Sequence, residues 1–264
     1  MSSSSRLLSA LFGALALCNS VLATELEQKP IIPDGYECQH PPYKVLMVSK
    51  SPLVIYIKDF ITPPERDHLL KLSKDTFTRS GVTGRQSHNS VRTSQSTTVP
   101  RDDIVRCIES RALAFQGYDV PASHLEPLQL VKYGPSERYH YHTDWFTSDH
   151  DTHQGGNRVS SFFAYVHVLN GTTGGGTNFP RLEAPADGRW CDDDIVDCDE
   201  TWDNGITFKP VEGNAIYWEN LAVDGRGDER TLHAGLPVVS GGKVGMNIWT
   251  RERALGKGIR GEDL

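Results

Sequence analysis

Short runs of β-branched and aromatic residues recur along the chain and predict β-strands. The first is Leu53–Phe60, where Val, Ile, Tyr and Phe dominate. After Pro121, similar runs alternate with gaps rich in turn-forming residues. These runs are Leu128–Tyr133, Tyr139–Trp145, Val159–Leu169, Ala215–Trp218 and Val244–Trp249. Many short strands joined by irregular loops are typical of a β-sandwich or barrel.

One segment before this β-rich part carries a clear helix start. Thr62 and Glu65 have the spacing of a capping box, and Pro63 suits a first helical turn, so we predict a helix over Arg66–Ser73. The polar segment Thr78–Thr98 follows it. That segment is expected to be a loop or an exposed strand pair, and it is the candidate lid of a site.

A second helix is predicted further along. Asp102 or Asp103 is expected to cap it, and it should continue to about Phe115 and end at Gly117. The whole pattern predicts a mainly β protein in which two flanking helices brace a double-sheet core within one domain.

The first 23 residues have the form of a secretory signal peptide. Arg6 precedes an apolar run, Leu7–Leu17, and small residues up to Ala23 suit a cleavage site. A membrane anchor is the alternative, but the run is shorter than the roughly 20 residues that span a bilayer. A proline-containing lead-in is then expected over residues 24–50.

The net charge bears on the binding partners, and the last residues bear on the localisation. Lys+Arg is 27 and Asp+Glu is 34, for a net charge of −7. This balance argues against nucleic acid, because phosphate binding needs a basic face. No later segment is apolar enough to span a membrane. The last residues, Gly261–Leu264, are not the Lys/His-Asp-Glu-Leu retention signal, so residence in the endoplasmic reticulum lumen and secretion both remain open.

Cysteine usage fits an oxidising compartment. Cys18 leaves with the signal peptide, and an even number remains, which allows three pairings: Cys38, Cys107, Cys191 and Cys198. The short loop between Cys191 and Cys198 favours that pair, which leaves Cys38 with Cys107. Asn170 begins an Asn-Gly-Thr glycosylation sequon.

Histidines and a carboxylate cluster in the segment after Tyr139. His140, His142 and Asp144 alternate, so on a strand they would share one face. His233 is the candidate third ligand. Two histidines and one carboxylate suit non-haem Fe(II), although zinc accepts the same ligands and His140 competes with His142 for the role.

Lys243 favours the iron interpretation. It follows His233 by ten residues and begins an otherwise mostly apolar strand that runs to Trp249. A lone lysine inside a β core is costly without an anion to pair with it, and a dicarboxylate co-substrate would supply one.

These residues together resemble the prolyl 4-hydroxylase branch of the 2-oxoglutarate/Fe(II) dioxygenases. The likeness rests on six motifs in the family's order over roughly residues 50–252. Gly134 falls early in the first motif, and Gly176 replaces a glutamate. The six motifs are Tyr133–Phe146, Asn157–Tyr165, Gly174–Pro180, Asp228, His233–Pro237 and Lys243–Trp249.

The resemblance implies a role for each matching residue. His142, Asp144 and His233 would hold Fe(II), and Lys243 would pair with the distal carboxylate of 2-oxoglutarate. The residues that would assist the co-substrate are Tyr133 and Thr177, and those that would line the substrate side are Tyr139, Arg158 and Trp249.

The family also implies a double-stranded β-helix (jelly-roll) core and a reaction. The domain would span residues 51–252, with its catalytic core at about 125–252 and a tail over 253–264. Fe(II), 2-oxoglutarate, O2 and ascorbate would be required. The reaction would be 4-hydroxylation of proline in a peptide or protein, with release of succinate and CO2.

Other functions remain open at this stage. The same chemistry could act on a free amino acid or small metabolite. A non-catalytic jelly-roll binding module and a zinc hydrolase are further alternatives, but the hydrolase leaves Lys243 unexplained and lacks an evident general base.

Overall fold

The computed structural model describes residues 36–81, 91–117, 119–183, 188–200 and 205–261. The signal peptide predicted over residues 1–23, the first part of the lead-in and the middle of the predicted lid therefore lie outside the described residues.

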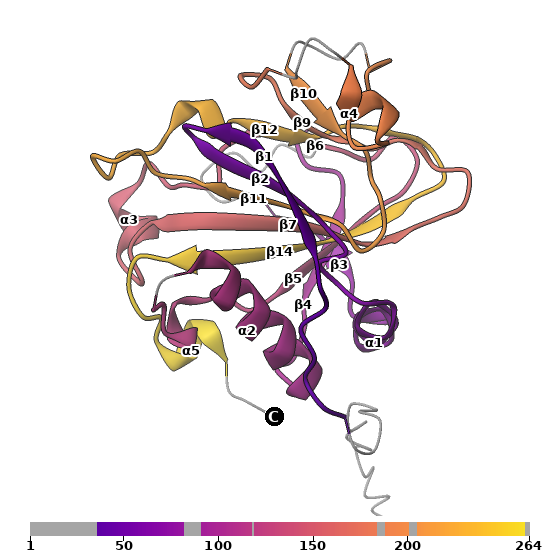
Figure 1. Ribbon diagram of the computed structural model, residues 1–264. Helices are drawn as coiled ribbons and strands as arrows, with labels where there is room; N and C mark the ends of the chain where they lie inside the picture. The colour runs from indigo at the N-terminus through magenta and orange to yellow at the C-terminus, as the bar shows by residue number, and fades with distance from the viewer. Residues whose placement is uncertain (1–35, 82–90, 118, 184–187, 201–204, 262–264) are drawn as a thin grey trace, which may run out of the picture.

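Two antiparallel sheets form the body of the protein (Figure 1). The larger sheet has eight strands, in the spatial order β1 (Lys44–Lys50), β2 (Leu53–Lys58), β11 (Ala215–Glu219), β7 (Arg158–Val168), β14 (Lys243–Arg251), β5 (Gln129–Tyr133), β4 (Gln95–Thr98) and β3 (Thr78–Arg79). The smaller sheet has the order β10 (Ile206–Phe208), β9 (Thr177–Phe179), β12 (His233–Gly235) and β6 (Tyr139–His142). A separate pair joins β13 (Val238–Ser240) to β8 (Thr173–Gly174). This is the expected jelly roll.

The short helices are peripheral, and two longer ones cover the large sheet. The longer ones are α1 (Pro63–Ser73) and α2 (Asp103–Gln116). The others are η1 (Ala122–His124), α3 (Asp149–Thr152), α4 (Arg189–Asp192), η2 (Glu229–Thr231) and α5 (Lys257–Arg260). None of the helices in the described ranges is long and apolar enough to cross a bilayer.

Both predicted helix starts are confirmed. The Thr62 hydroxyl accepts from the Glu65 N–H, and the Glu65 carboxylate accepts from the Thr62 N–H at 2.9 Å, which completes the capping box. Asp102, rather than Asp103, caps α2 by accepting from the Val105 N–H. Gly117 ends α2 with a φ of 72°, a conformation that glycine adopts without a steric cost.

The central strands divide the core into two clusters. Because successive side chains on a strand point to opposite faces, Phe162 and Ala164 of β7 pack under the helices while Phe163 and Tyr165 face the small sheet. The same alternation in β14 places Lys243 on the inner side. The fold therefore directs one face of its two central strands into the space between the sheets.

Two disulfides join parts of the chain as predicted. Cys38 is bonded to Cys107, which ties the lead-in to α2, and Cys191 is bonded to Cys198 across a short loop. The buried Arg111–Glu65 ion pair, at 2.6 Å, ties the two long helices to each other.

One strand prediction needs correction, and the strand pair expected within Thr78–Thr98 is confirmed. The predicted strand Tyr139–Trp145 is shorter, because β6 ends at His142 and the chain bends through Asp144. The polar segment after α1 contributes a strand at each end, β3 and β4, which pair with each other at the edge of the large sheet.

Candidate active site

The three predicted metal ligands converge although they come from separate elements. β6 and β12 pair in antiparallel register, which sets His142 opposite His233. Asp144 reaches the same point because the chain bends after β6. Their candidate ligand atoms all lie within 4.8 Å of one another. The Asp144 carboxylate lies 3.8 Å from Nε2 of His142 and 3.9 Å from Nε2 of His233.

Backbone carbonyls fix both imidazoles for metal binding. Nδ1 of His142 donates to the carbonyl of His140 at 2.8 Å, and Nδ1 of His233 donates to the carbonyl of Thr231 at 2.9 Å. A carbonyl only accepts, so each Nδ1 carries the proton and each Nε2 keeps its lone pair. This is the tautomer that a metal requires.

Charge at the triad matches that assignment. Burial and the neighbouring His233 lower the pKa of His142 to about 3, so this ring is neutral at physiological pH. Burial alone would raise the pKa of Asp144, but the nearby His233, His142 and Arg158 lower it to about 2. Two imidazoles and one carboxylate form a donor set that fits Fe(II).

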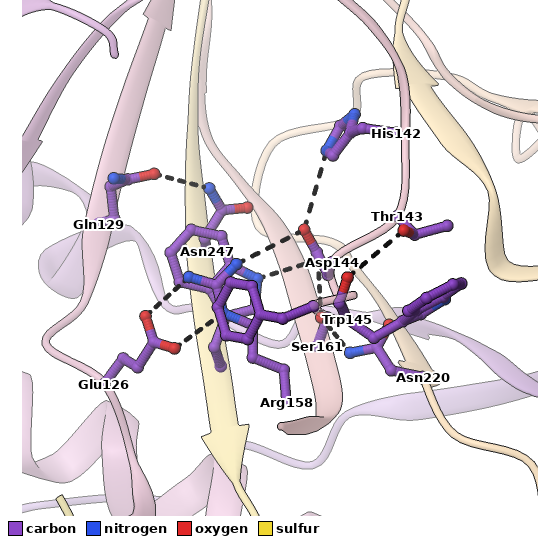
Figure 2. Close-up of polar contacts among 12 residues, drawn as sticks. Glu126, Gln129, His142, Thr143, Asp144, Trp145, Arg158, Ser161, Asn220 and Asn247 are labelled. Carbon is purple, nitrogen blue, oxygen red and sulfur yellow. Dashed lines mark hydrogen bonds and ion pairs between the residues drawn. The ribbon is translucent and has the colours of Figure 1, made fainter. Parts of the chain in front are cut away.

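A hydrogen-bond chain orients the Asp144 carboxylate (Figure 2). Its Oδ2 accepts from the Ser161 hydroxyl at 2.7 Å and from the Trp249 indole N–H at 2.9 Å. Asn220 in turn donates to Ser161. Such outer partners hold a ligand at one angle and reduce its freedom.

Lys243 lies inside the barrel as predicted. It is 2% exposed, and burial lowers its pKa to about 7. Its ammonium donates to the carbonyl of Gly175 and lies 4.9 Å from the centroid of the Tyr133 ring. Within the described ranges it forms no ion pair, so no opposite charge faces this buried amine.

Tyr133 and Thr177 are buried beside the triad. β5 and β14 pair so that Tyr133 stands opposite Lys243, and the Thr177 hydroxyl shares a 2.7 Å hydrogen bond with that of Tyr165. Both residues line the same cleft as His142 and His233. The cleft has a volume of about 750 Å³.

The outer part of the cleft is walled by stacked rings and paired charges. Tyr139 stacks on His142 with ring centroids 3.6 Å apart. The Arg158 guanidinium lies 3.7 Å from the Trp249 ring and donates two hydrogen bonds, at 2.7 and 2.8 Å, to the Glu126 carboxylate. Thus the three predicted substrate-side residues do lie together.

Comparison with known proteins identifies the family. Residues 128–251 match the 2OG-Fe(II) oxygenase superfamily. Prolyl 4-hydroxylase 1 of Arabidopsis thaliana is 32% identical over 216 residues, which are 79% of this chain and 72% of that protein. Prolyl 4-hydroxylase 2 of the same plant is 33% identical over 216 residues, which are 79% and 70% of the two chains. The chain belongs to the prolyl 4-hydroxylase family.

Membership of this family makes the protein a 2-oxoglutarate- and Fe(II)-dependent dioxygenase, and it decides against the binding-module and zinc-hydrolase alternatives. The viral collagen prolyl hydroxylase of Paramecium Bursaria Chlorella virus-1, solved with 2-oxoglutarate, shares the fold. It is 24% identical with a TM-score of 0.54, and the match covers 75% of this chain and 95% of that one.

Other sequence candidates stand apart from the prolyl 4-hydroxylase site. His140 is exposed and contributes its backbone carbonyl rather than its ring. In the acidic segment around α4, Asp194 pairs with Lys209. Asp228, which ends an Arg-Gly-Asp tripeptide, is 7% exposed and pairs with Arg230. Asn170 is exposed in the turn after β7.

Sequence reasoning missed several residues that shape this site. Glu126 holds Arg158 and also Arg251, whose Nη1 lies 2.9 Å from its carboxylate. These partners are 32 and 125 positions away, so no local motif marks Glu126. Ser161 did belong to a quoted motif, and its spacing from Arg158 on β7 was the available signal.

Proposed function

We propose that the protein hydroxylates prolyl residues of a peptide or protein at the 4-position. The observation that carries this proposal is the buried Lys243, which forms no ion pair among the described residues and stands opposite Tyr133. Tyr133 in turn lines the cleft that holds His142, Asp144 and His233. A molecule with a carboxylate at one end and metal-chelating oxygens at the other fits such a cleft. 2-Oxoglutarate has this form.

Each residue has a part in binding the reactants. His142, Asp144 and His233 would hold Fe(II), which when bound supplies the redox chemistry of the reaction. Lys243 would donate to the distal carboxylate of 2-oxoglutarate, assisted by the hydroxyls of Tyr133 and Thr177. One atom of O2 enters succinate and the other enters the new hydroxyl, while CO2 leaves.

The outer cleft would position the substrate. Tyr139, Trp249 and Arg158 form a wall of flat faces beside the triad, and such faces suit a prolyl ring. The wall would also exclude water from the reacting carbon. The names of the Arabidopsis relatives support proline as the target.

The setting would be the secretory pathway. A signal peptide over residues 1–23 would direct entry, and the two disulfides suit an oxidising lumen. Asn170, exposed at its turn, would carry an N-linked glycan. Ascorbate would be required as a reductant, as the resemblance implies.

The test is an assay of residues 24–264 expressed in an oxidising host. Succinate is measured with Fe(II), ascorbate and 2-oxoglutarate, with and without a library of proline-containing peptides, beside His142→Ala. The proposal expects peptide-stimulated succinate and a product heavier by one oxygen atom, which derives from ¹⁸O2. Succinate formation that no peptide stimulates would point to a small metabolite as the substrate and would contradict the proposal.

A further inference from the structure

A second hollow adjoins the catalytic cleft. It has a volume of about 610 Å³, and two of its lining residues, Asp151 and Ile259, also line the cleft that holds the triad. An ion pair also links their linings. Glu126 lines the catalytic cleft, Arg251 lines the second hollow, and the two side chains form an ion pair at 2.9 Å. The two hollows are therefore parts of one groove.

The far wall of this groove is α5, near the end of the chain. The match to the oxygenase superfamily stops at Arg251, so α5 lies outside the matched residues. Leu255 anchors the segment by packing against Gly155, where a Cβ would lie 2.6 Å from the leucine side chain. Arg260 anchors it again by donating to the carbonyl of Leu125 at 2.6 Å.

Between these anchors, Ile259 is left without cover. It is 41% exposed, whereas Leu255 and Arg260 on either side of it are 6% and 9% exposed. A single exposed isoleucine is common on protein surfaces. Ile259 differs because it faces both hollows of a groove whose other end holds the metal ligands.

The charges of the outer hollow are already engaged. Arg251 bonds to Glu126 and to the backbone carbonyls of Asp151 and Gln154. The Asp151 carboxylate lies 3.5 Å from the ring of His150. His150, His153 and Gln154 line the hollow as exposed polar residues, and Ile259 supplies its apolar surface.

We propose that α5 is the distal wall of the peptide-binding groove and that Ile259 contacts an apolar side chain of the peptide, several residues from the hydroxylated proline. This inference rests on the proposed peptide hydroxylation and deepens it, because it makes the enzyme select for residues outside the reacting one. The occupant is the substrate itself, since the outer hollow is continuous with the site where the proline would react.

The test compares long and short substrates. A blocked decapeptide, the best substrate from the library, spans about 31 Å if it is extended as polyproline II, and the blocked tripeptide around the same proline spans about 9 Å. For Ile259→Ser we expect the ratio of the decapeptide KM to the tripeptide KM to rise about fivefold, which is the loss expected for one half-buried aliphatic contact. Ile259→Val should keep the wild-type ratio.

Val239→Ser is the matched control, because Val239 is 73% exposed on β13 and lines neither hollow. Melting temperatures of all variants establish that they fold. A serine scan of the decapeptide should reveal one apolar position whose replacement raises KM for the wild type but not for Ile259→Ser.

The outcomes separate this inference from the proposed function. If peptides stimulate succinate release but Ile259→Ser behaves like Val239→Ser, the role of α5 is wrong and the proposed function stands. If the KM of both peptides rises equally, the residue acts on the reacting end, and the inference is again wrong. If no peptide stimulates turnover, the proposed function and this inference both fail.

Discussion

The two ends of the catalytic groove are built in different ways. At the inner end, Lys243 and the triad lie on or beside strands of the two sheets, and each polar group is held by a fixed backbone or side-chain partner. At the outer end, the wall consists of ion pairs, stacked rings and a short C-terminal helix. The inner end therefore suits a single reaction with fixed geometry. The outer end suits discrimination among different substrates.

The largest effect is expected at the triad. Asp144→Asn keeps the shape of the side chain but removes the charge that binds the metal, so succinate formation should fall by at least about 100-fold. Retained iron, measured by elemental analysis after dialysis, should fall with it. Asp194→Asn, in the surface ion pair with Lys209, is the control. An Asp144→Asn enzyme with wild-type iron and turnover would remove this residue from the ligand set.

A second large effect is expected at Lys243. Lys243→Met fills similar space without the ammonium, and truncating one partner of a buried charge pair typically costs about 2–5 kcal/mol. The KM for 2-oxoglutarate should rise by about 100-fold in this variant. Lys132→Met on the neighbouring strand β5, where the side chain is exposed, should leave that KM unchanged. Equal KM values for 2-oxoglutarate in the two variants would contradict the assignment of Lys243 to 2-oxoglutarate binding.

A medium effect is expected from pH. In the free enzyme the pKa of Lys243 is lowered to about 7 by burial, whereas a bound dicarboxylate favours the ammonium form. Binding above pH 7 therefore takes up a proton, and the affinity for 2-oxoglutarate should fall by about tenfold between pH 7.5 and 8.5. Calorimetry in buffers of different ionisation enthalpy measures this uptake. The dependence should be absent in Lys243→Met, and its persistence there would assign it to another group.

The smallest effect is expected at the outer wall. Glu126→Gln removes the charge that holds Arg158 and Arg251 but keeps a polar group in its place, so the peptide KM should rise about fivefold, which is roughly 1 kcal/mol, the net scale of one ordinary hydrogen bond. The KM for 2-oxoglutarate should not change, because Glu126 does not reach the inner end. Glu37→Gln, exposed in the lead-in, is the control. If the KM for 2-oxoglutarate changed more than the peptide KM, Glu126 would act on the inner end, which would contradict the assignment of different roles to the two ends.

The inner end was also the part that the sequence could predict. The long strands β7 and β14 show clear β-rich runs, and His142, Asp144, His233 and Lys243 stand at characteristic spacings. The expectation that His142 and Asp144 share one face of a strand was wrong. Asp144 shares the site with His142 because the chain bends after β6, and not because both residues lie on one strand.

The outer end could not be predicted because its contacts join distant residues. Glu126 pairs with residues far along the chain, and Ile259 gains its position only through the anchors at Leu255 and Arg260. Strands of two or three residues, such as β8, β12 and β13, are also too short to show any periodicity. They exist because neighbouring strands supply their hydrogen bonds.

The position of Trp249 has an optical consequence. Its indole N–H donates to Asp144, and its ring lies against the Arg158 guanidinium, so it touches both ends of the groove at once. Indole emission responds to nearby charge and to paramagnetic quenchers. Among the five tryptophans of the chain, Trp249 is thus placed to act as an intrinsic fluorophore that signals metal loading through one face and substrate arrival through the other, without any added label.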